Sequence, residues 1–262
     1  MTSINNKDWE LPNFDIIEFG PKKTKYCVGI PVINEGEKFK KQIIEMKKYS
    51  HLADIVIFDG GSTDGSTNQG FLKKNSARTL LMLKGFGKQG TQLRMGLSYA
   101  IKQGYEGVIT VDGNGKDDVK AIPQFIKSLD DGFDYTQGSR FIKGGKAIHT
   151  PLIRFFAIRF VHAPIISLGA KHWYTDTTNG FRAYSKKYLL SPNVKPFRNI
   201  FVKYELYLYL SIRANRLGFK TKEIPVTRGY PKGTVPTKIH GLKSYFDFLS
   251  TTIKTALGYY NP

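Results

Sequence analysis

The stretch DIVIFDGGSTDG, residues 54–65, joins a short apolar run to a loop of glycine, serine, threonine and aspartate. Its first half, Asp54–Asp59, has the isoleucine and valine content of a strand, and its second half has the composition of a tight loop. A strand that is apolar throughout is typical of a parallel sheet buried on both faces. Ligands of such sheets bind at the carboxyl ends of the strands, so this polar loop is a candidate binding segment.

The same unit is repeated on both sides of this stretch. Apolar runs predict further strands at 26–33, 79–83, 107–112 and 134–137, and helical spacing predicts helices at 37–49, 89–103 and 117–129. This alternation predicts an α/β fold with a mainly parallel, twisted sheet flanked by helices. The polar residues that follow the strands should then meet at one edge of the sheet.

The second half of the chain is less regular, and aromatic and basic residues interleave throughout it. The sequence predicts an amphipathic helix at 151–168 that is broken near Pro164, a helix at 202–217, a strand at 220–226 and a final amphipathic helix at 242–257. Helices of this kind suit a membrane interface, and they equally suit an ordinary position facing the core.

Composition narrows the classes of partner. The 262 residues carry a net charge of +19, which fits nucleic acid, an anionic membrane surface, phosphate-rich substrates or a solvated basic surface. The single cysteine, Cys27, excludes a disulfide within the chain, and this fits a cytoplasmic location. The polar first residues lack the apolar stretch of a signal peptide, and no run approaches the roughly 18 apolar residues of a membrane-spanning helix. We therefore expect a protein that touches a membrane without crossing it.

The stretch GFGKQG, residues 85–90, has the glycine spacing of the dinucleotide-binding fingerprint. That fingerprint normally occupies the first turn of its unit, whereas two strand–loop units precede this one. The simpler interpretation is a loop whose backbone N–H groups approach a phosphate or a sugar, with Lys88 adding positive charge.

Acidic residues end two of the predicted strands. Asp59 can accept hydrogen bonds from a nucleobase or ribose, or it can belong to a plain turn. In VDGN, residues 111–114, the oxygen-bearing side chains of Asp112 and Asn114 are spaced two apart and can reach one hard cation. Such a cation would bridge the diphosphate of a donor and neutralise its charge as it leaves.

Together these motifs resemble family 2 glycosyltransferases of the GT-A fold, most closely the polyprenyl- or dolichyl-phosphate mannose synthase group. Six segments carry the resemblance in the order that the family has them: IPVINE at 30–35, DGGSTDG at 59–65, DGN at 112–114, GSRF at 138–141 with Gly144 and Gly145, DTTNGFR at 176–182, and EIPV at 223–226 followed by Arg228, Gly233 and Lys238. The resemblance implies an N-terminal extension at 1–24, a single GT-A domain at 25–239 and an amphipathic C-terminal tail at 240–262.

The resemblance also implies roles for individual residues. Pro31, Ile33, Glu35 and Asp59 would line the nucleotide base and ribose, Asp112 and Asn114 would hold Mg²⁺ or Mn²⁺, Arg140 and Arg154 would meet phosphates or the anionic head of the acceptor, and Arg228 and Lys238 would lie on a mobile loop that closes over the diphosphate. The chain departs from the family pattern at Ile33, Gly60, Asn114 and Ile158, where the family has Tyr, Asp, Asp and Ser.

The implied reaction is the transfer of a sugar from a GDP- or UDP-sugar, with inversion. A polyprenyl-phosphate acceptor is already an anion and needs no general base, and it is the acceptor we favour. A saccharide hydroxyl, as in polysaccharide synthesis, would need a carboxylate to take its proton, and Glu205 and Asp176 are the candidates. We expect the protein on the inner face of a membrane, as a peripheral protein that binds an anionic surface.

Two other classes remain open from the residues alone. A nicotinamide-dependent oxidoreductase would rest on the loop at 85–90. A nucleic-acid-binding protein would rest on the charge of +19. Acidic residues at the strand ends and the lack of a recognised signature count against nucleic acid as a partner.

Overall fold

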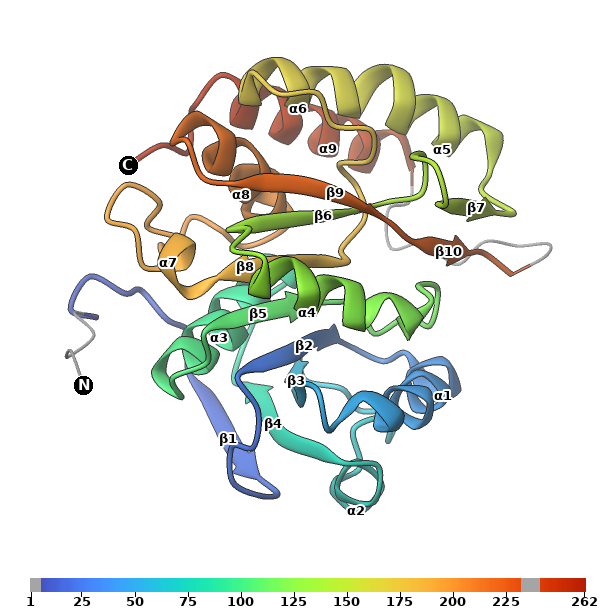
Figure 1. The fold of residues 1–262 in the computed structure, drawn as a ribbon, viewed down its shortest axis with the longest axis vertical. Helices are drawn as coiled ribbons and strands as arrows, with labels where there is room; N and C mark the ends of the chain where they lie inside the picture. The colour runs from blue at the N-terminus through green and yellow to red at the C-terminus, as the bar shows by residue number, and fades with distance from the viewer. Residues whose placement is uncertain (1–5, 232–240) are drawn as a thin grey trace.

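The computed structural model describes residues 6–231 and 241–262. In this part of the chain, the strands of the main sheet are β1 (Phe14–Glu18), β2 (Tyr26–Val32), β3 (Asp54–Asp59), β4 (Ala77–Leu83), β5 (Gly107–Thr110), β6 (Tyr135–Ser139), β8 (Arg182–Ser185) and β9 (Thr221–Pro225). They lie side by side in the order β1-β4-β3-β2-β5-β8-β6-β9 (Figure 1). A parallel two-stranded ribbon pairs β7 (Lys146–Ile148) with β10 (Thr227–Gly229).

The helices alternate with the strands in the first half and gather in the second. They are α1 (Gly36–Met46), α2 (Gln69–Lys74), α3 (Gln89–Lys102), α4 (Ile122–Asp130), α5 (Leu152–Phe156), α6 (Ala163–Ala170), α7 (Lys186–Leu189), α8 (Glu205–Arg216) and α9 (Gly241–Ala256). Short 3-10 turns occur at η1 (Lys47–Tyr49) and η2 (Val119–Ala121), and η3 (Ala157–His162) is a π-helix between α5 and α6.

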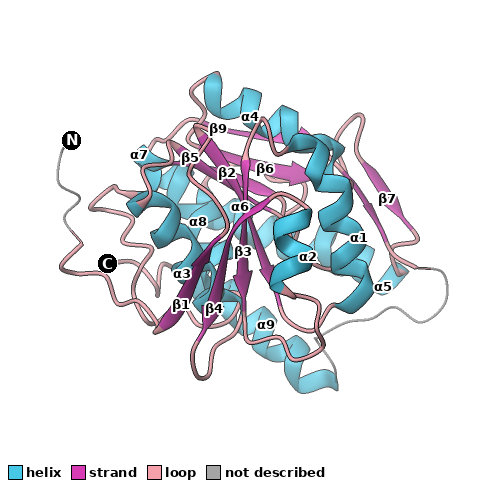
Figure 2. Ribbon diagram, turned by 90° about the horizontal axis from the view of Figure 1, so that it is seen from below, coloured by secondary structure: helices cyan, strands magenta, loops and turns pink. Residues whose placement is uncertain are grey.

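The centre of the sheet is parallel, as the apolar runs predict. Strands β4, β3, β2 and β5 pair in parallel, and every residue of β2 and β3 is buried. Figure 2 shows α1 and α2 on one side of these strands and α3 on the other. Each face carries its own apolar core: one joins Phe39 of α1 to Phe125 of α4, and the other joins Leu97 of α3 to Leu210 of α8. The predicted fold class is confirmed.

Two strands of the main sheet were not predicted, and both run against their neighbours. β1 (Phe14–Glu18) lies in the stretch 1–24 that the sequence analysis described as an N-terminal extension, and it pairs antiparallel with β4 at the sheet edge. Its isoleucines are partly exposed, so it lacks the continuous apolar run of a central strand. β8 is antiparallel to both β5 and β6 and has the sequence RAYS. Its arginine and serine interrupt the apolar pattern by which a strand is predicted. The division of the chain at residues 24 and 239 stays a prediction.

Residues 152–170 form one helix, so the predicted break near Pro164 is wrong. Pro164 lies in the first turn of α6, where a missing N–H is tolerated, and the wider turn of η3 carries the helix up to it. By length and composition, this 19-residue helix could cross a membrane, with a mean hydropathy of 1.5 and 33% of its residues buried. The expectation that no segment reaches this threshold is therefore wrong for the described residues.

Candidate functional site

A cavity of about 1050 Å³ lies at the carboxyl ends of β2, β4 and β5. Loops that follow these strands form one wall, and residues of α5, η3, α8 and α9 form the opposite wall. Nine of the residues predicted from the sequence line it: Pro31, Ile33, Glu35, Lys88, Asp112, Asn114, Arg140, Arg154 and Arg228. Asp59, Asp176 and Glu205 are not among the lining residues, and Lys238 lies outside the residues that the structure describes.

Asp59 shapes the loop instead of facing the cavity. Its carboxylate is 2% exposed and accepts hydrogen bonds from the backbone N–H and hydroxyl of Ser62, at 3.0 and 2.6 Å, and from the hydroxyl of Thr67 at 3.3 Å. Asn34, at φ 50°, in turn accepts a bond of 2.8 Å from the N–H of Thr63. The loops after β2 and β3 are thereby joined, and the Asp59 carboxylate does not line the cavity.

The glycine that departs from the family pattern, Gly60, is explained by close packing. A Cβ at this position would lie 2.4 Å from the amide nitrogen of Gln92. That amide donates to the carbonyl oxygens of Val32 at 2.7 Å and Phe58 at 3.2 Å, and so connects α3 to the ends of β2 and β3. The space that a second aspartate would need is occupied by Gln92.

Both carboxylate oxygens of Asp112 are engaged by side chains of this chain. Oδ1 accepts a hydrogen bond of 3.1 Å from the Gln89 amide, and Oδ2 accepts one of 3.2 Å from the Arg228 guanidinium. Gly180 packs against this carboxylate so closely that a Cβ there would lie 2.3 Å from Oδ1. The glycine of the DTTNGFR motif thus makes room for the acid of the DGN motif.

Behind Asp112, Arg228 forms a second ion pair with the fully buried Asp117. Burial raises the pKa of Asp117 to about 6, although the charge of Arg228 opposes this shift. Burial alone would lower the pKa of Arg228, but the two carboxylates outweigh it and raise that pKa. Arg228 is therefore a fixed, permanently charged group at the floor of the cavity.

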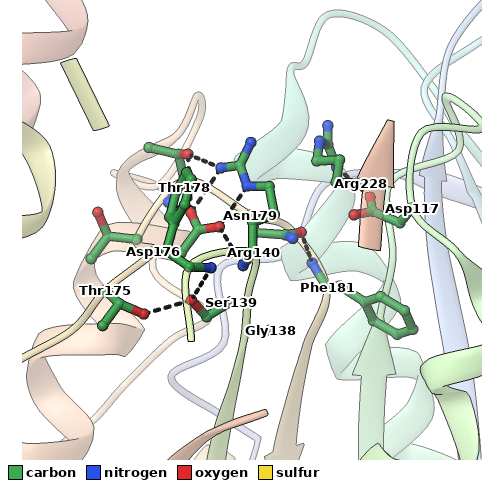
Figure 3. A network of polar contacts seen from close by, with 12 residues as sticks. Asp117, Gly138, Ser139, Arg140, Thr175, Asp176, Thr178, Asn179, Phe181 and Arg228 are labelled. Carbon is green, nitrogen blue, oxygen red and sulfur yellow. Dashed lines mark hydrogen bonds and ion pairs between the residues drawn. The ribbon is translucent and has the colours of Figure 1, made fainter. Parts of the chain in front are cut away.

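Figure 3 shows another buried ion pair, which joins Asp176 to Arg140. Its oxygens accept from Arg140 Nε at 2.6 Å, from Nη2 at 2.8 Å and from the backbone N–H at 3.2 Å. The hydroxyl of Thr178 accepts a further bond from the guanidinium at 2.9 Å. The side chains of Arg140 and Asp176 are 1% and 0% exposed, so Asp176 positions an arginine of the cavity wall and offers no lone pair to an acceptor hydroxyl.

Glu205 is likewise used inside the protein. It is the first residue of α8, and its carboxylate accepts a bond of 2.6 Å from the backbone N–H of Lys203. An acid in the first turn of a helix is stabilised by the unpaired N–H groups there. The structure gives no support to the predicted roles of Glu205 and Asp176 as general bases, and both roles stay predictions.

A basic cluster lies around Tyr230, and the sequence analysis predicted its arginines but missed Lys116 and Tyr230. The Lys116 ammonium is 5.1 Å from the centre of the Tyr230 ring, and the Arg154 guanidinium donates to the Tyr230 hydroxyl at 3.2 Å. Burial would raise the pKa of Tyr230, but the charges of Arg228, Arg140 and Arg154 outweigh it and lower that pKa. The net effect indicates a positive potential in the cavity. Lys116 follows Asn114 at the same two-residue spacing that separates Asn114 from Asp112. This spacing in the sequence could have indicated that Lys116 shares their site.

The glycines of the GFGKQG loop are explained by packing and backbone geometry. Gly85 has φ +80°, and a Cβ on Gly90 would lie 2.8 Å from the carbonyl oxygens of Phe201 and Lys203. Lys88 precedes the first residue of α3 and lines the cavity, as predicted for a residue near a phosphate. No feature of this loop calls for a dinucleotide.

The side-chain oxygens of the DGN motif do not form a ligand set that fits a divalent cation. Asp112 is bonded to Gln89 and Arg228, and the side-chain oxygen of Asn114 accepts a bond of 3.2 Å from the backbone N–H of Lys116. Mg²⁺ and Mn²⁺ require several oxygen ligands, and carboxylates supply most of the binding charge. Among the described residues, no group of three or more His, Cys, Asp or Glu side chains could hold a metal ion.

Helices of the second half give the cavity an apolar wall that continues onto the surface. Ile153, Ile158 and Phe248 line the cavity, while Phe160 and Leu168 of the same helical layer are 67% and 82% exposed. In Figure 1, α5, α6 and α9 form one layer at the far end of the molecule from β1. A backbone contact holds this layer together, since a Cβ on Gly169 would lie 2.8 Å from Cα of Ala256.

No family model matches the chain. The chain is 23% identical over 212 residues to glycosyltransferase AglJ of Haloferax volcanii, covering 81% of this chain and 65% of that protein, so it spans about two thirds of the relative's length. It is 22% identical over 206 residues to polyprenol monophosphomannose synthase of Mycolicibacterium smegmatis, covering 76% of each.

Solved structures with the same architecture include glucosyl-3-phosphoglycerate synthase of Mycobacterium tuberculosis in complex with phosphoglyceric acid. It has a TM-score of 0.62 and 17% identity, and the match covers 88% of this chain and 78% of that chain. The same enzyme with Mn²⁺, UDP and phosphoglyceric acid also gives a TM-score of 0.62. These likenesses confirm the GT-A fold and the predicted resemblance to the mannose synthase group. They lend no support to an oxidoreductase or a nucleic-acid-binding protein.

Proposed function

Because this GT-A chain is similar to family 2 glycosyltransferases, we propose that it transfers a sugar from a GDP- or UDP-sugar to the phosphate of a polyprenyl-phosphate lipid. The observation that carries the proposal is the cavity itself. It joins polar loops at the strand ends to an apolar wall of helices, and basic side chains outnumber acidic ones along its lining. A nucleotide diphosphate suits the first part, and a lipid that carries a phosphate suits the second.

The reaction requires from the protein mainly positive charge near the leaving group and correct positioning of the two substrates. An oxygen of the acceptor phosphate forms the bond to the anomeric carbon, and the bond from that carbon to the diphosphate oxygen breaks. The nucleoside diphosphate leaves with the electron pair, and no proton has to be moved. Fixed cations such as Arg228 stabilise the charge that develops on the leaving group, because they are already in place before the reaction.

The engagement of Asp112, Asp176 and Glu205 with groups of this chain favours this acceptor over a saccharide hydroxyl. Among the described residues, the carboxylates that line the cavity are Glu35, Asp112 and Asp247. Asp112 is bonded to Gln89 and Arg228, and the predicted bases Asp176 and Glu205 lie outside the lining. The name of the mycobacterial relative, a polyprenol monophosphomannose synthase, agrees with a lipid-phosphate acceptor.

A lipid acceptor requires the protein to reach a membrane. The exposed apolar side chains of residues 152–170 and of α9 supply a surface that can enter the headgroup region. Arg159 in this segment and Lys171, which follows it directly, suit anionic lipid. We infer a peripheral position on the inner face of a membrane, with the mouth of the cavity beside the bilayer.

Thermal shift measurements test both halves of the proposal. UDP, GDP, CDP, ADP, NAD⁺ and a short-chain polyprenyl phosphate are each added at saturating concentration. A ligand at 100 times its dissociation constant adds about 2.7 kcal/mol, which raises the melting temperature by about 5–10 °C in a chain of this size. We expect a shift with one nucleoside diphosphate and a separate shift with the lipid phosphate. A shift with NAD⁺ alone would contradict the proposal.

A further inference from the structure

The side chains of the DGN motif and its neighbour Lys116 do not form the ligand set that the divalent cation of this fold family would need. Asp112, Asn114 and Lys116 alternate along one turn after β5, and all three line the cavity. In a divalent-cation site these positions would carry oxygen ligands and negative charge. Here they carry one carboxylate, one neutral amide and one ammonium group.

The carboxylate of that set is already neutralised. Arg228 donates to Asp112 Oδ2 at 3.2 Å, and its guanidinium is 8% exposed. Arg228 cannot easily leave, because its other nitrogen pairs with Asp117, whose side chain is 0% exposed. A divalent cation at Asp112 would have to displace Arg228 and leave the buried Asp117 with a weakened partner.

Lys116 places a further positive charge in the cavity, two residues after Asn114. Its ammonium lies 5.1 Å from the Tyr230 ring centre, in the same group of side chains as Arg154 and Arg228. A divalent cation beside an ammonium and a guanidinium is repelled by both. A diphosphate beside them is attracted by both.

We propose that this chain binds the diphosphate of its donor without a divalent cation, because the side chains of Lys116 and Arg228 supply the positive charge. The inference rests on the proposed function, since it concerns the same site and the same ligand class. It sets this chain apart from the Mn²⁺ complex of the mycobacterial synthase, with which it shares the fold. Two protein cations held by Asp117 and Tyr230 need no assembly when the donor arrives.

Isothermal titration of UDP and GDP into the full chain tests the proposal, first in EDTA and then in Mn²⁺. The affinity for the preferred diphosphate should change by less than about threefold between the two conditions. Lys116→Met should weaken that affinity in EDTA by about tenfold or more, because the charge is lost while the stem is kept. The matched control is Lys120→Met, an exposed lysine four residues further on, which should leave the affinity unchanged.

Direct Mn²⁺ binding, followed by electron paramagnetic resonance, supplies a readout that is independent of the nucleotide. The wild-type chain should leave the signal of free Mn²⁺ unchanged. Asn114→Asp and Lys116→Gln combined with Arg228→Gln replace the amide and the ammonium by oxygen ligands and free the Asp112 carboxylate, and should create Mn²⁺ binding and a diphosphate affinity that depends on Mn²⁺.

Three results would count against the inference or its premise. Diphosphate binding by the wild type that Mn²⁺ strengthens about tenfold or more would overturn the inference, as would Mn²⁺ binding that Asp112→Asn removes. If neither UDP nor GDP binds in EDTA or in Mn²⁺, the proposed function fails and the inference fails with it. The nucleotide titration therefore separates the two failures.

Discussion

At the scale of single residues, residue type and spacing identified the cavity better than they identified the direction of each side chain. Acids at strand ends were predicted to face a ligand, and Asp112 lines the cavity. Asp59 turns its oxygens to Ser62 and Thr67 in its own loop. A strand end places a residue at the sheet edge, but local hydrogen bonds decide where its side chain points.

The pair formed by Arg140 and Asp176 gives a prediction at this scale. Asp176→Asn leaves a buried guanidinium without its charge partner, and should lower the free energy of unfolding by about 3–5 kcal/mol. The double variant Arg140→Met with Asp176→Leu removes both charges and should recover much of that loss. Urea denaturation of the wild type and both variants measures this.

Turnover by the folded fraction separates the structural role of Asp176 from the catalytic one. If Asp176 only positions Arg140, Asp176→Asn should retain measurable transfer once the unfolded fraction is accounted for. Complete loss of transfer, with donor binding and stability unchanged, would restore Asp176 as a general base.

At the scale of elements, the helical layer of residues 152–170 and α9 combines two functions. Its inner side lines the cavity, and its outer side exposes large apolar side chains. The sequence indicated amphipathic helices here and left open whether they face a core or a membrane. Periodicity could not decide, because both environments select the same apolar stripe.

Removing exposed apolar side chains that do not line the cavity tests the membrane contact. Phe160→Ser with Leu168→Ser should greatly reduce co-flotation of the protein with vesicles that contain anionic lipid. Binding of the preferred nucleoside diphosphate should be unchanged. Ile16→Ser is the matched control, since Ile16 is 50% exposed on β1 at the opposite end of the molecule, and it should float like the wild type. Equal flotation of all three proteins would refute the docking surface.

The contact between η3 and α9 gives a prediction for acid stability. Burial lowers the pKa of His162 to about 4, and its ring packs 4.6 Å from that of Phe248 and bonds to Thr252 at 3.2 Å. The unfolded chain binds this proton near pH 6.5 and the folded chain only near pH 4, so stability is full above pH 6.5 and is lost as the pH falls through this window.

The full loss should be on the order of 3 kcal/mol. His162→Phe cannot take up the proton, so its melting temperature should fall less than that of the wild type between pH 6.5 and pH 4. Melting curves at matched ionic strength measure the difference. Parallel pH profiles for the two proteins would contradict a lowered pKa of His162 in the folded chain.

At the scale of the whole molecule, the parallel centre of the sheet and most of its helices could be predicted from the sequence. Buried parallel strands are apolar throughout, and this pattern is strong. The antiparallel strands β1 and β8 were not predicted, because β1 is half exposed and β8 carries the buried Arg182. Arg182 donates to the nearby carbonyl oxygens of Asn179 and Thr177 and to the carbonyl oxygen of Tyr207, which only the folded chain brings close.

Part of the candidate site could also be predicted from the sequence, and part could not. The residues after the central strands were predicted, because parallel strands deliver their carboxyl ends to one place. The helical wall, Tyr230 and the ion pairs of Arg228 depend on contacts between distant segments, such as the 111 residues that separate Asp117 from Arg228. No local pattern encodes contacts of this range.

The central claim is sugar transfer to a lipid phosphate, and the product of that reaction tests it most directly. The purified chain is mixed with vesicles that contain a polyprenyl phosphate, and separately with water-soluble saccharides, in the presence of each common GDP- and UDP-sugar. Mass spectrometry of the lipid fraction should show one glycosyl group added to the polyprenyl phosphate with one donor, and the saccharide mixtures should show none. Transfer to saccharides with an unmodified lipid fraction would contradict the account.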